Sequence, residues 1–183
     1  GYDESAFNGV AFQKESRAEK LLVNAGNIFA YQNPKRLWDQ IKIENENGNK
    51  ISIMFIGTVD KEILDYLIKL GLSNSVQVAG FLSYPKMIEQ ICMADMLLVC
   101  SSEPRHVPGK LFEAMRTGNQ IIAFGDNNEE VKQILKEANA GMMFGYDENV
   151  EEFFRVNFKR YENQKLLLKY DRSSISKEFS KIL

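Results

Sequence analysis

The chain has 183 residues, of which 44% are hydrophobic and 26% are charged, so it is long enough to bury the core of one domain. Its formal net charge of -2 offers no general attraction for nucleic acid or for an anionic membrane surface. No stretch approaches the run of about 18 apolar residues that marks a membrane-spanning helix. We therefore expect a globular protein of the cytoplasm, with no nucleic acid among its partners.

Residues 1–20 are mostly polar or small and show no sustained apolar periodicity. This composition is typical of a linker or an arm, so we expect the segment to lie outside the core. We interpret it as the remainder of an interdomain linker, which implies a chain cut from a longer protein. Residues 21–183 then form one domain.

Strands and helices are predicted to alternate from Leu21 onward. Short apolar runs predict five strands and a weaker sixth, and helical periodicity predicts a helix after each strand, with Asp60 and Ser83 as caps. The predicted strands are residues 21–26, 51–57, 76–80, 96–100, 120–124 and 140–145. The predicted helices are residues 34–45, 61–70, a segment after Ser83, a segment from Pro108, and residues 128–138, 151–161 and 173–183.

This alternation over short connections predicts an α/β fold with a Rossmann-like open parallel sheet of about six strands and helices on both faces. In such sheets, ligands bind at the carboxyl ends of the strands, where the strand order reverses. The connections expected at this edge are residues 25–33, 57–60, 80–83 and 101–109. We expect any binding site to be built from them.

The last of these connections leads into the sequence PGKLFEAM. Pro108 suits the first position of a helix, and Gly109 lets a ligand approach the backbone closely. The free N–H groups of the helix start favour an anion such as a phosphate, to which Lys110 would add a full charge. Glu113 is suited to accept hydrogen bonds from sugar hydroxyls. The alternative is that Lys110 and Glu113 form a solvated pair on an ordinary amphipathic helix.

Other candidate ligand-binding groups are few. Gly26 follows the first strand, where the missing side chain permits close approach by a ligand or by another backbone segment. Neither the dinucleotide fingerprint GxGxxG nor the phosphate-binding GxxxxGK[ST] occurs, which argues against a dehydrogenase or an ATPase. Arg105 and His106, the only histidine, either assist phosphate binding or are plain surface residues.

The cysteines and acidic residues do not indicate a metal site. Cys92 and Cys100 lie in apolar surroundings, which is typical of buried, reduced thiols. Asp126, Glu129 and Glu130 stand where negative charge is expected at the start of a helix, so we assign them to helix capping. We expect no metal, and no residue is assigned a catalytic role.

Four stretches, taken in chain order, resemble the carboxyl-terminal, donor-binding half of a GT-B glycosyltransferase of the large retaining group called family 4, or glycosyl transferases group 1. The first is GYDESAF, which resembles the end of the interdomain linker. The others are VNAGNIFAYQNPKRLWDQI, VQVAGFLSYPKMIEQICMADMLLVCS and VPGKLFEAMRTGNQIIAFG, which resemble three blocks of the donor domain. The resemblance covers nearly the whole chain and implies one half of a GT-B fold.

The resemblance also implies a role for particular residues. Glu113 would bind the ribose as the second glutamate of the family's Glu-x7-Glu motif, while Lys110 would lie by the diphosphate. The first strand's glycine loop would approach the sugar phosphate, and the loop after the third strand would border the nucleobase. The implied donor-binding residues are Gly26, Asn27, Gly80, Phe81, Leu82, Arg105, Gly109, Lys110, Leu111 and Glu113.

Three positions depart from the family pattern. Arg105 stands at the position of the first motif glutamate, and Asn27 and Gln32 stand where many relatives have Arg and Lys. These changes remove groups that contact the sugar and neutralise the phosphates in such relatives. We hypothesise that Arg105 supplies part of the missing positive charge.

The resemblance implies transfer of a sugar from a UDP- or GDP-linked donor to a glycan or lipid-linked acceptor, in bacterial cell-envelope polysaccharide synthesis, without cofactor or metal. An amino-terminal domain would bind the acceptor and place the full-length protein in the cytoplasm or at the inner membrane face. The chain alone is then expected to bind nucleotide weakly and to transfer no sugar. Two alternatives stay open: a degenerate Rossmann-like regulatory or interaction module, and half of a nucleotide-sugar epimerase with the same fold.

Overall fold

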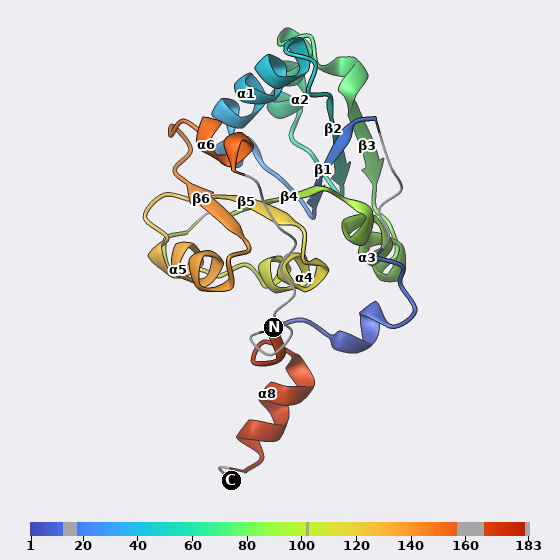
Figure 1. The fold of residues 1–183 in the computed structure, drawn as a ribbon, viewed down its shortest axis with the longest axis vertical. Coiled ribbons are helices and arrows are strands. Elements are labelled where there is room, and N and C mark those ends of the chain that lie inside the picture. The colour runs from blue at the N-terminus through green and yellow to red at the C-terminus, as the bar shows by residue number, and fades with distance from the viewer. Residues whose placement is uncertain (13–17, 102, 157–166, 182–183) are drawn as a thin grey trace.

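The structure, a computed structural model, describes residues 1–12, 18–101, 103–156 and 167–181. Its six-stranded sheet has the order β3-β2-β1-β4-β5-β6 (Figure 1), and every neighbouring pair of strands is parallel. The strands are β1 (Lys20–Ala25), β2 (Ile51–Ile56), β3 (Val76–Gly80), β4 (Met96–Cys100), β5 (Gln120–Phe124) and β6 (Gly141–Phe144). The predicted open parallel sheet is confirmed.

Helices cover both faces of the sheet, as predicted. The covering helices are α1 (Lys35–Glu46), α2 (Lys61–Lys69), α3 (Tyr84–Met93), α4 (Gly109–Thr117), α5 (Glu129–Ala138) and α6 (Glu151–Arg155), whereas α8 (Arg172–Phe179) extends away from the sheet (Figure 1). One buried apolar cluster joins the sheet to α3, α4 and α5, and a second joins it to α1, α2 and α6. Val23 belongs to the first cluster and Leu22 to the second, because successive side chains of a strand point to opposite faces.

The helix boundaries agree closely with the sequence prediction, except that the last two helices end earlier than predicted; α8 ends at Phe179, although the predicted helix ran to residue 183. Asp60 caps α2 as predicted, since its side chain accepts a hydrogen bond from the backbone N–H of Glu62. Ser83 precedes α3 as predicted, but its side chain makes no capping hydrogen bond. The helix predicted over residues 151–161 ends at Arg155, and residues 157–161 lie outside the described part of the chain.

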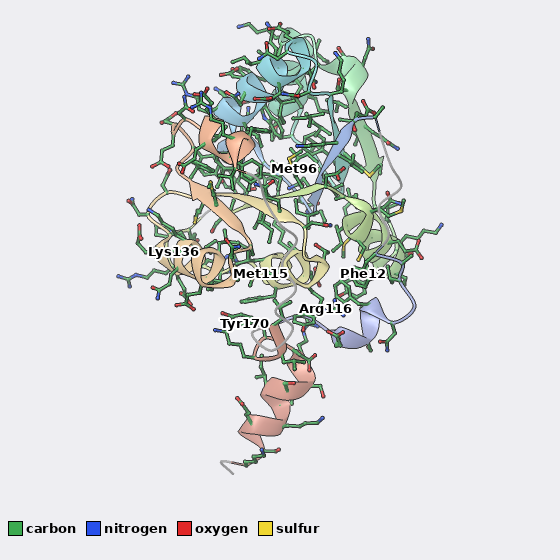
Figure 2. The ribbon with its side chains drawn as sticks, in the orientation of Figure 1. Phe12, Met96, Met115, Arg116, Lys136 and Tyr170 are labelled. Carbon is green, nitrogen blue, oxygen red and sulfur yellow. The ribbon has the colours of Figure 1, made fainter. Side chains whose placement is uncertain are left out.

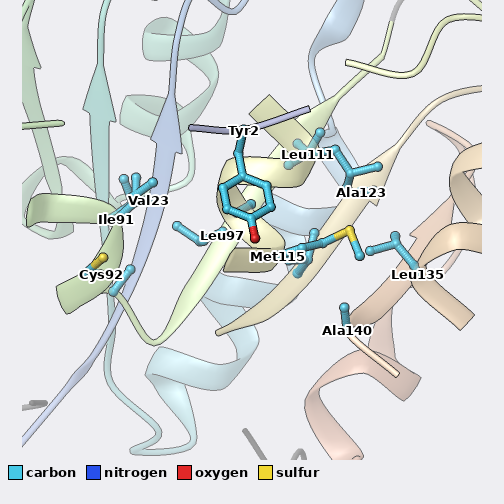
Figure 3. Close-up of a cluster of buried hydrophobic side chains, with 14 of the residues drawn as sticks. Tyr2, Val23, Ile91, Cys92, Leu97, Leu111, Met115, Ala123, Leu135 and Ala140 are labelled. Carbon is cyan, nitrogen blue, oxygen red and sulfur yellow. The ribbon is translucent and has the colours of Figure 1, made fainter. Parts of the chain in front are cut away.

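The first residues of the chain do not lie outside the core, so this part of the prediction is wrong. Tyr2 and Phe7 are 1% and 3% exposed and belong to the cluster beneath α3, α4 and α5. Figure 3 shows the Tyr2 ring among side chains that include Leu97 and Met115. A 3₁₀ helix over Glu4–Phe7 turns the segment back toward the sheet. Isolated aromatic residues in a polar segment leave no periodic signal, which is why the sequence did not reveal their burial.

The start of α5 also differs from the prediction. Its cap is Asn128, whose side chain accepts a hydrogen bond from a backbone N–H of the first turn. Glu129 and Glu130 lie in that turn as predicted. Asp126 instead accepts a hydrogen bond from the backbone N–H of Tyr146, at 3.2 Å, so its assignment to capping is wrong.

The two cysteines, Cys92 and Cys100, are buried thiols that are not joined in a disulfide, as predicted. Among the described helices, none combines the length and the apolar character needed to cross a membrane.

Candidate functional site

A cavity of about 350 Å³ opens beside the point where the strand order reverses. From β1, the chain runs to β2 and β3 on one side, whereas β4, β5 and β6 follow on the other. The cavity lies at the carboxyl ends of β1 and β2, between the starts of α3 and α4. It is lined by Ala25, Gly26, Asn27, Ile56, Gly57, Phe81, Leu82, Tyr84, Met87, Lys110 and Glu113. Sheet topology thus brings together connections that are far apart in the sequence.

Two glycines form the floor of this site. Gly26 and Gly57 follow β1 and β2 and have φ angles of +110° and +108°, which side-chain-bearing residues rarely adopt. A Cβ atom on Gly57 would lie 3.0 Å from the carbonyl carbon of Gly26, so the two loops meet backbone to backbone. The side chain of Asn27 joins them as well, because its Oδ1 accepts a hydrogen bond from the backbone N–H of Thr58 at 3.0 Å.

Lys110 lies in the first turn of α4 and reaches toward the glycine loop. Its Nζ is 3.8 Å from the position that a Cβ of Gly26 would occupy. Burial lowers the pKa of Lys110, opposed by the nearby Cys100, and burial also raises the pKa of Cys100 to about 12. No carboxylate of the described residues forms an ion pair with Lys110. A desolvated cation without a counter-ion is costly in a folded protein, and a bound anion would supply the missing charge.

Glu113 faces the same cavity from the next turn of α4. Its Oε1 accepts a hydrogen bond from the hydroxyl of Tyr84, at 2.9 Å. Lys110 and Glu113 form no ion pair with each other, so the alternative of an ordinary surface pair is wrong. The cavity therefore holds a cation and a carboxylate that do not neutralise each other, so each can contact a different part of a ligand.

The structure brings together six of the sequence-predicted residues: Gly26, Asn27, Phe81, Leu82, Lys110 and Glu113. Phe81 is 81% exposed at the rim. Gly80 does not line the cavity but holds the loop after β2, since its carbonyl oxygen accepts a hydrogen bond from the N–H of Gly57 at 2.7 Å. Gly109 begins α4, and the position that its Cβ would occupy is open space.

Two predicted residues lie apart from the cavity. The side chain of Leu111 is fully buried in the core, and its backbone N–H donates to the carbonyl oxygen of Pro108 at 2.9 Å. Arg105 is exposed on the loop before α4 and does not line the cavity. The hypothesis that Arg105 supplies positive charge to the site therefore has no support from the geometry, and the donor-binding role of Leu111 rests on the family resemblance alone.

Five lining residues were not among the predicted site residues: Ala25, Ile56, Gly57, Tyr84 and Met87. Gly57 follows a buried strand as Gly26 does, and this pattern could have identified Gly57 as a site residue. Tyr84 was recognisable only as the first residue of a helix.

Gln32 stands at one of the positions that depart from the family pattern. It is 7% exposed, and its Oε1 accepts a hydrogen bond from the N–H of Phe29 at 3.2 Å.

Asn128 is a further residue that the sequence analysis placed only near a helix start. Its Nδ2 donates to the carbonyl oxygens of Glu103, at 3.1 Å, and His106, at 2.9 Å. These two bonds hold the loop that leads into α4. Asn128 is buried and thus positions the start of the helix that carries Lys110. Within the described residues, no cluster of three or more His, Cys, Asp or Glu could hold a metal ion.

Residues 10–178 match the family model of the glycosyl transferases group 1. The chain belongs to this family. The match covers the sheet, the helices on both faces and the cavity, and it confirms the resemblance drawn from the sequence motifs. A comparison with curated protein sequences found no match.

Solved structures of glycosyltransferases share the fold. Anabaena HepE, crystallised in complex with UDP and glucose, has a TM-score of 0.73 at 15% identity, over 100% of this chain and 55% of HepE. The lipopolysaccharide-biosynthesis glycosyltransferase WaaG has a TM-score of 0.60 at 18% identity, over 93% of this chain and 45% of WaaG. The C-terminal domain of LpcC from Francisella tularensis has a TM-score of 0.65 at 14% identity, over 94% of this chain and 100% of that domain. This chain thus spans about half the length of the first two glycosyltransferases and has the fold of one GT-B half.

Proposed function

We propose that this chain is the donor-binding domain of a retaining glycosyltransferase and that its cavity binds the nucleoside diphosphate of a sugar donor. The observation that carries the proposal is the meeting of Lys110 and Glu113 in one cavity at the reversal of strand order. Lys110 has no carboxylate partner among the described residues, which suits it to an anion. Glu113 is a hydrogen-bond acceptor placed one helical turn away, which suits it to ribose hydroxyls.

In this proposal, the domain stabilises the departing nucleoside diphosphate. Negative charge develops on the diphosphate as the bond to the sugar breaks, and the start of α4 together with Lys110 lies where it would interact with that charge. No metal ion or cofactor is proposed, because these groups perform the same electrostatic role. HepE was crystallised with UDP, and this supports UDP rather than GDP as the first nucleotide to test.

An acceptor, a glycan or a lipid-linked sugar, would be bound by a second domain of the full-length protein, across a cleft that faces this cavity. WaaG is involved in lipopolysaccharide biosynthesis, which supports a role in cell-envelope polysaccharide synthesis, at the cytoplasmic side of the membrane. We expect the chain alone to bind nucleotide and to transfer no sugar. Turnover of a sugar nucleotide by the isolated chain would contradict that expectation.

Calorimetric titration of the chain with UDP and with GDP tests the donor site. We expect one of them to bind, and the Glu113→Ala variant to lose roughly tenfold or more in affinity, as expected when hydrogen bonds to a charged group are removed. Glu130→Ala, on the exposed side of α5, is the matched control and should bind as the unsubstituted chain does. Absence of heat with both nucleotides would indicate a degenerate module and overturn the proposal.

A further inference from the structure

The hydroxyl of Tyr84 donates a hydrogen bond to the Glu113 carboxylate in the cavity. Tyr84 is the first residue of α3, and Glu113 lies on α4, 29 residues later in the chain. The two helices lie next to each other on one face of the sheet (Figure 1). Both residues line the cavity, so their hydrogen bond is part of the surface that a ligand would contact.

From this geometry we infer that Tyr84 is a positioning residue that orients Glu113 and thereby determines selectivity for ribose over deoxyribose in the bound nucleotide. The inference rests on the proposed function. A glutamate side chain has several rotatable bonds, and holding one oxygen fixes the direction of the other. With Oε1 bound to the phenol, Oε2 stays available to a sugar hydroxyl that donates a hydrogen bond.

The phenol is suited to act as a constant donor. Burial, followed by the hydrogen bond to Glu113, raises the pKa of Tyr84 to about 12, so the hydroxyl keeps its proton across the neutral range. Lys110 does not compete for the carboxylate, because the two form no ion pair.

Tyr84 is 42% exposed, so removal of its hydroxyl leaves no buried void and is a mild change. Tyr84→Phe keeps the ring that forms part of the cavity wall and deletes only the bond to Glu113. Tyr66 offers a matched control, because its hydroxyl also donates to a carboxylate, Oδ1 of Asp39 at 2.7 Å. Neither Tyr66 nor Asp39 lines the cavity, so Tyr66→Phe removes an equivalent bond elsewhere.

The test compares the affinities for UDP and 2′,3′-dideoxy-UDP, or for the guanosine pair if GDP binds more tightly. We expect Tyr84→Phe to reduce the preference for the ribonucleotide by roughly five- to tenfold, the usual effect of one such hydrogen bond. The affinity for the dideoxynucleotide should be unchanged, and Tyr66→Phe should leave both affinities unchanged. An equal loss for both nucleotides, or no loss for either, overturns the inference. If the unsubstituted chain binds no nucleotide, the proposed function itself fails, and the inference fails with it.

A titration without ligand tests the contact independently. In the Glu113→Gln variant, the pKa of Tyr84 should fall part of the way from about 12 toward its ordinary value of 10.0, because the hydrogen-bonded carboxylate is removed while burial is kept. Arg172 and Asp3 also act on this phenol, and both are present in the variant. The phenolate absorbance, taken as a difference from Tyr84→Phe, measures the shift, and an unchanged pKa would overturn the contact.

Discussion

Helix α4 carries a cation at each end, and the two have opposite surroundings. Lys110, in the first turn, faces the cavity and has no ion-pair partner among the described residues. Arg116, in the last turn, donates hydrogen bonds from Nε and Nη2 to both carboxylate oxygens of Glu4. Its guanidinium also lies over the rings of Phe7 and Phe12, 5.1 and 5.2 Å from their centroids. Figure 2 shows Arg116 and Phe12 together at the first segment of the chain.

The difference separates a structural cation from one suited to a ligand. A charge that contributes to folding finds its partner within the chain, as Arg116 does. A partly buried charge without such a partner opposes folding and contributes only when an anion binds. The contrast leads to paired substitutions that remove each charge and keep an unbranched side chain.

The largest effect is expected for Lys110→Met. Loss of the cation should weaken binding of the nucleoside diphosphate by roughly 10- to 100-fold, since a charge-assisted contact in a partly buried site is lost. The free energy of unfolding should not fall, because the variant no longer buries an unpaired charge. Calorimetric titration and urea denaturation measure the two quantities. Lys136→Met, on the exposed side of α5 (Figure 2), is the control, and a large loss of stability in Lys110→Met would show that Lys110 is structural.

Arg116→Met should have the opposite result. We expect the free energy of unfolding to fall by about 1–2 kcal/mol, a moderate value because Glu4 is partly exposed. Nucleotide affinity should be unchanged, since Arg116 does not line the cavity. Amide hydrogen exchange should show that protection is lost first in residues 1–12. If Arg116→Met keeps full stability or loses nucleotide binding, Arg116 is not the structural cation of α4 and the contrast with Lys110 fails.

The smallest effect is expected in how the free energy of unfolding depends on pH through Glu4 and through Lys110. The hydrogen bond to Arg116, opposed by burial, lowers the pKa of Glu4 below 4.5, so its stabilising contribution is present above pH 4.5 and is lost as the pH falls through the lower, folded-state pKa. Burial lowers the pKa of Lys110 below 10.5, so its cost to stability is fully present at neutral pH and is relieved as the pH rises from the folded-state pKa toward 10.5. Stability should therefore rise with pH in both ranges, but at neutral pH Glu4 stabilises the fold whereas Lys110 opposes folding. We expect Glu4→Gln to remove the loss of stability on the acid side and Lys110→Met to remove the gain on the alkaline side, each under about 1 kcal/mol. Unfolding free energies measured across both ranges check these expectations, and a fall in stability as the pH rises through either range would contradict them.

The sequence predicted the edge of the sheet at which the cavity lies, because the patterns that determine this edge are short-range. Apolar runs and helical periodicity depend on neighbouring residues, and the Pro-Gly start of α4 is a short-range signal. Once the strands are known to be parallel, their carboxyl ends must share one edge. Lys110 and Glu113 were therefore predicted at the edge where the structure places them.

The contacts across the cavity were not predictable in the same way. The bond between Tyr84 and Glu113 depends on how α3 and α4 are rotated against the sheet, and helix packing tolerates a range of such rotations. The hypothesis for Arg105 rested on its place in the family motif beside the start of α4, whereas in the structure Asn128 holds this loop and the Arg105 side chain is exposed. Loop paths follow from tertiary contacts that no local pattern records.

By itself, the sequence determined the order of strands and helices, the parallel sheet and the edge at which α4 begins, because each of these follows from short-range periodicity and capping. Tertiary structure alone decided which cation has a partner. Glu4 and Arg116 are 112 residues apart, and only the folding of the first segment onto α4 brings them together. The same packing leaves Lys110 unpaired, because no described carboxylate is brought close enough to form an ion pair with it.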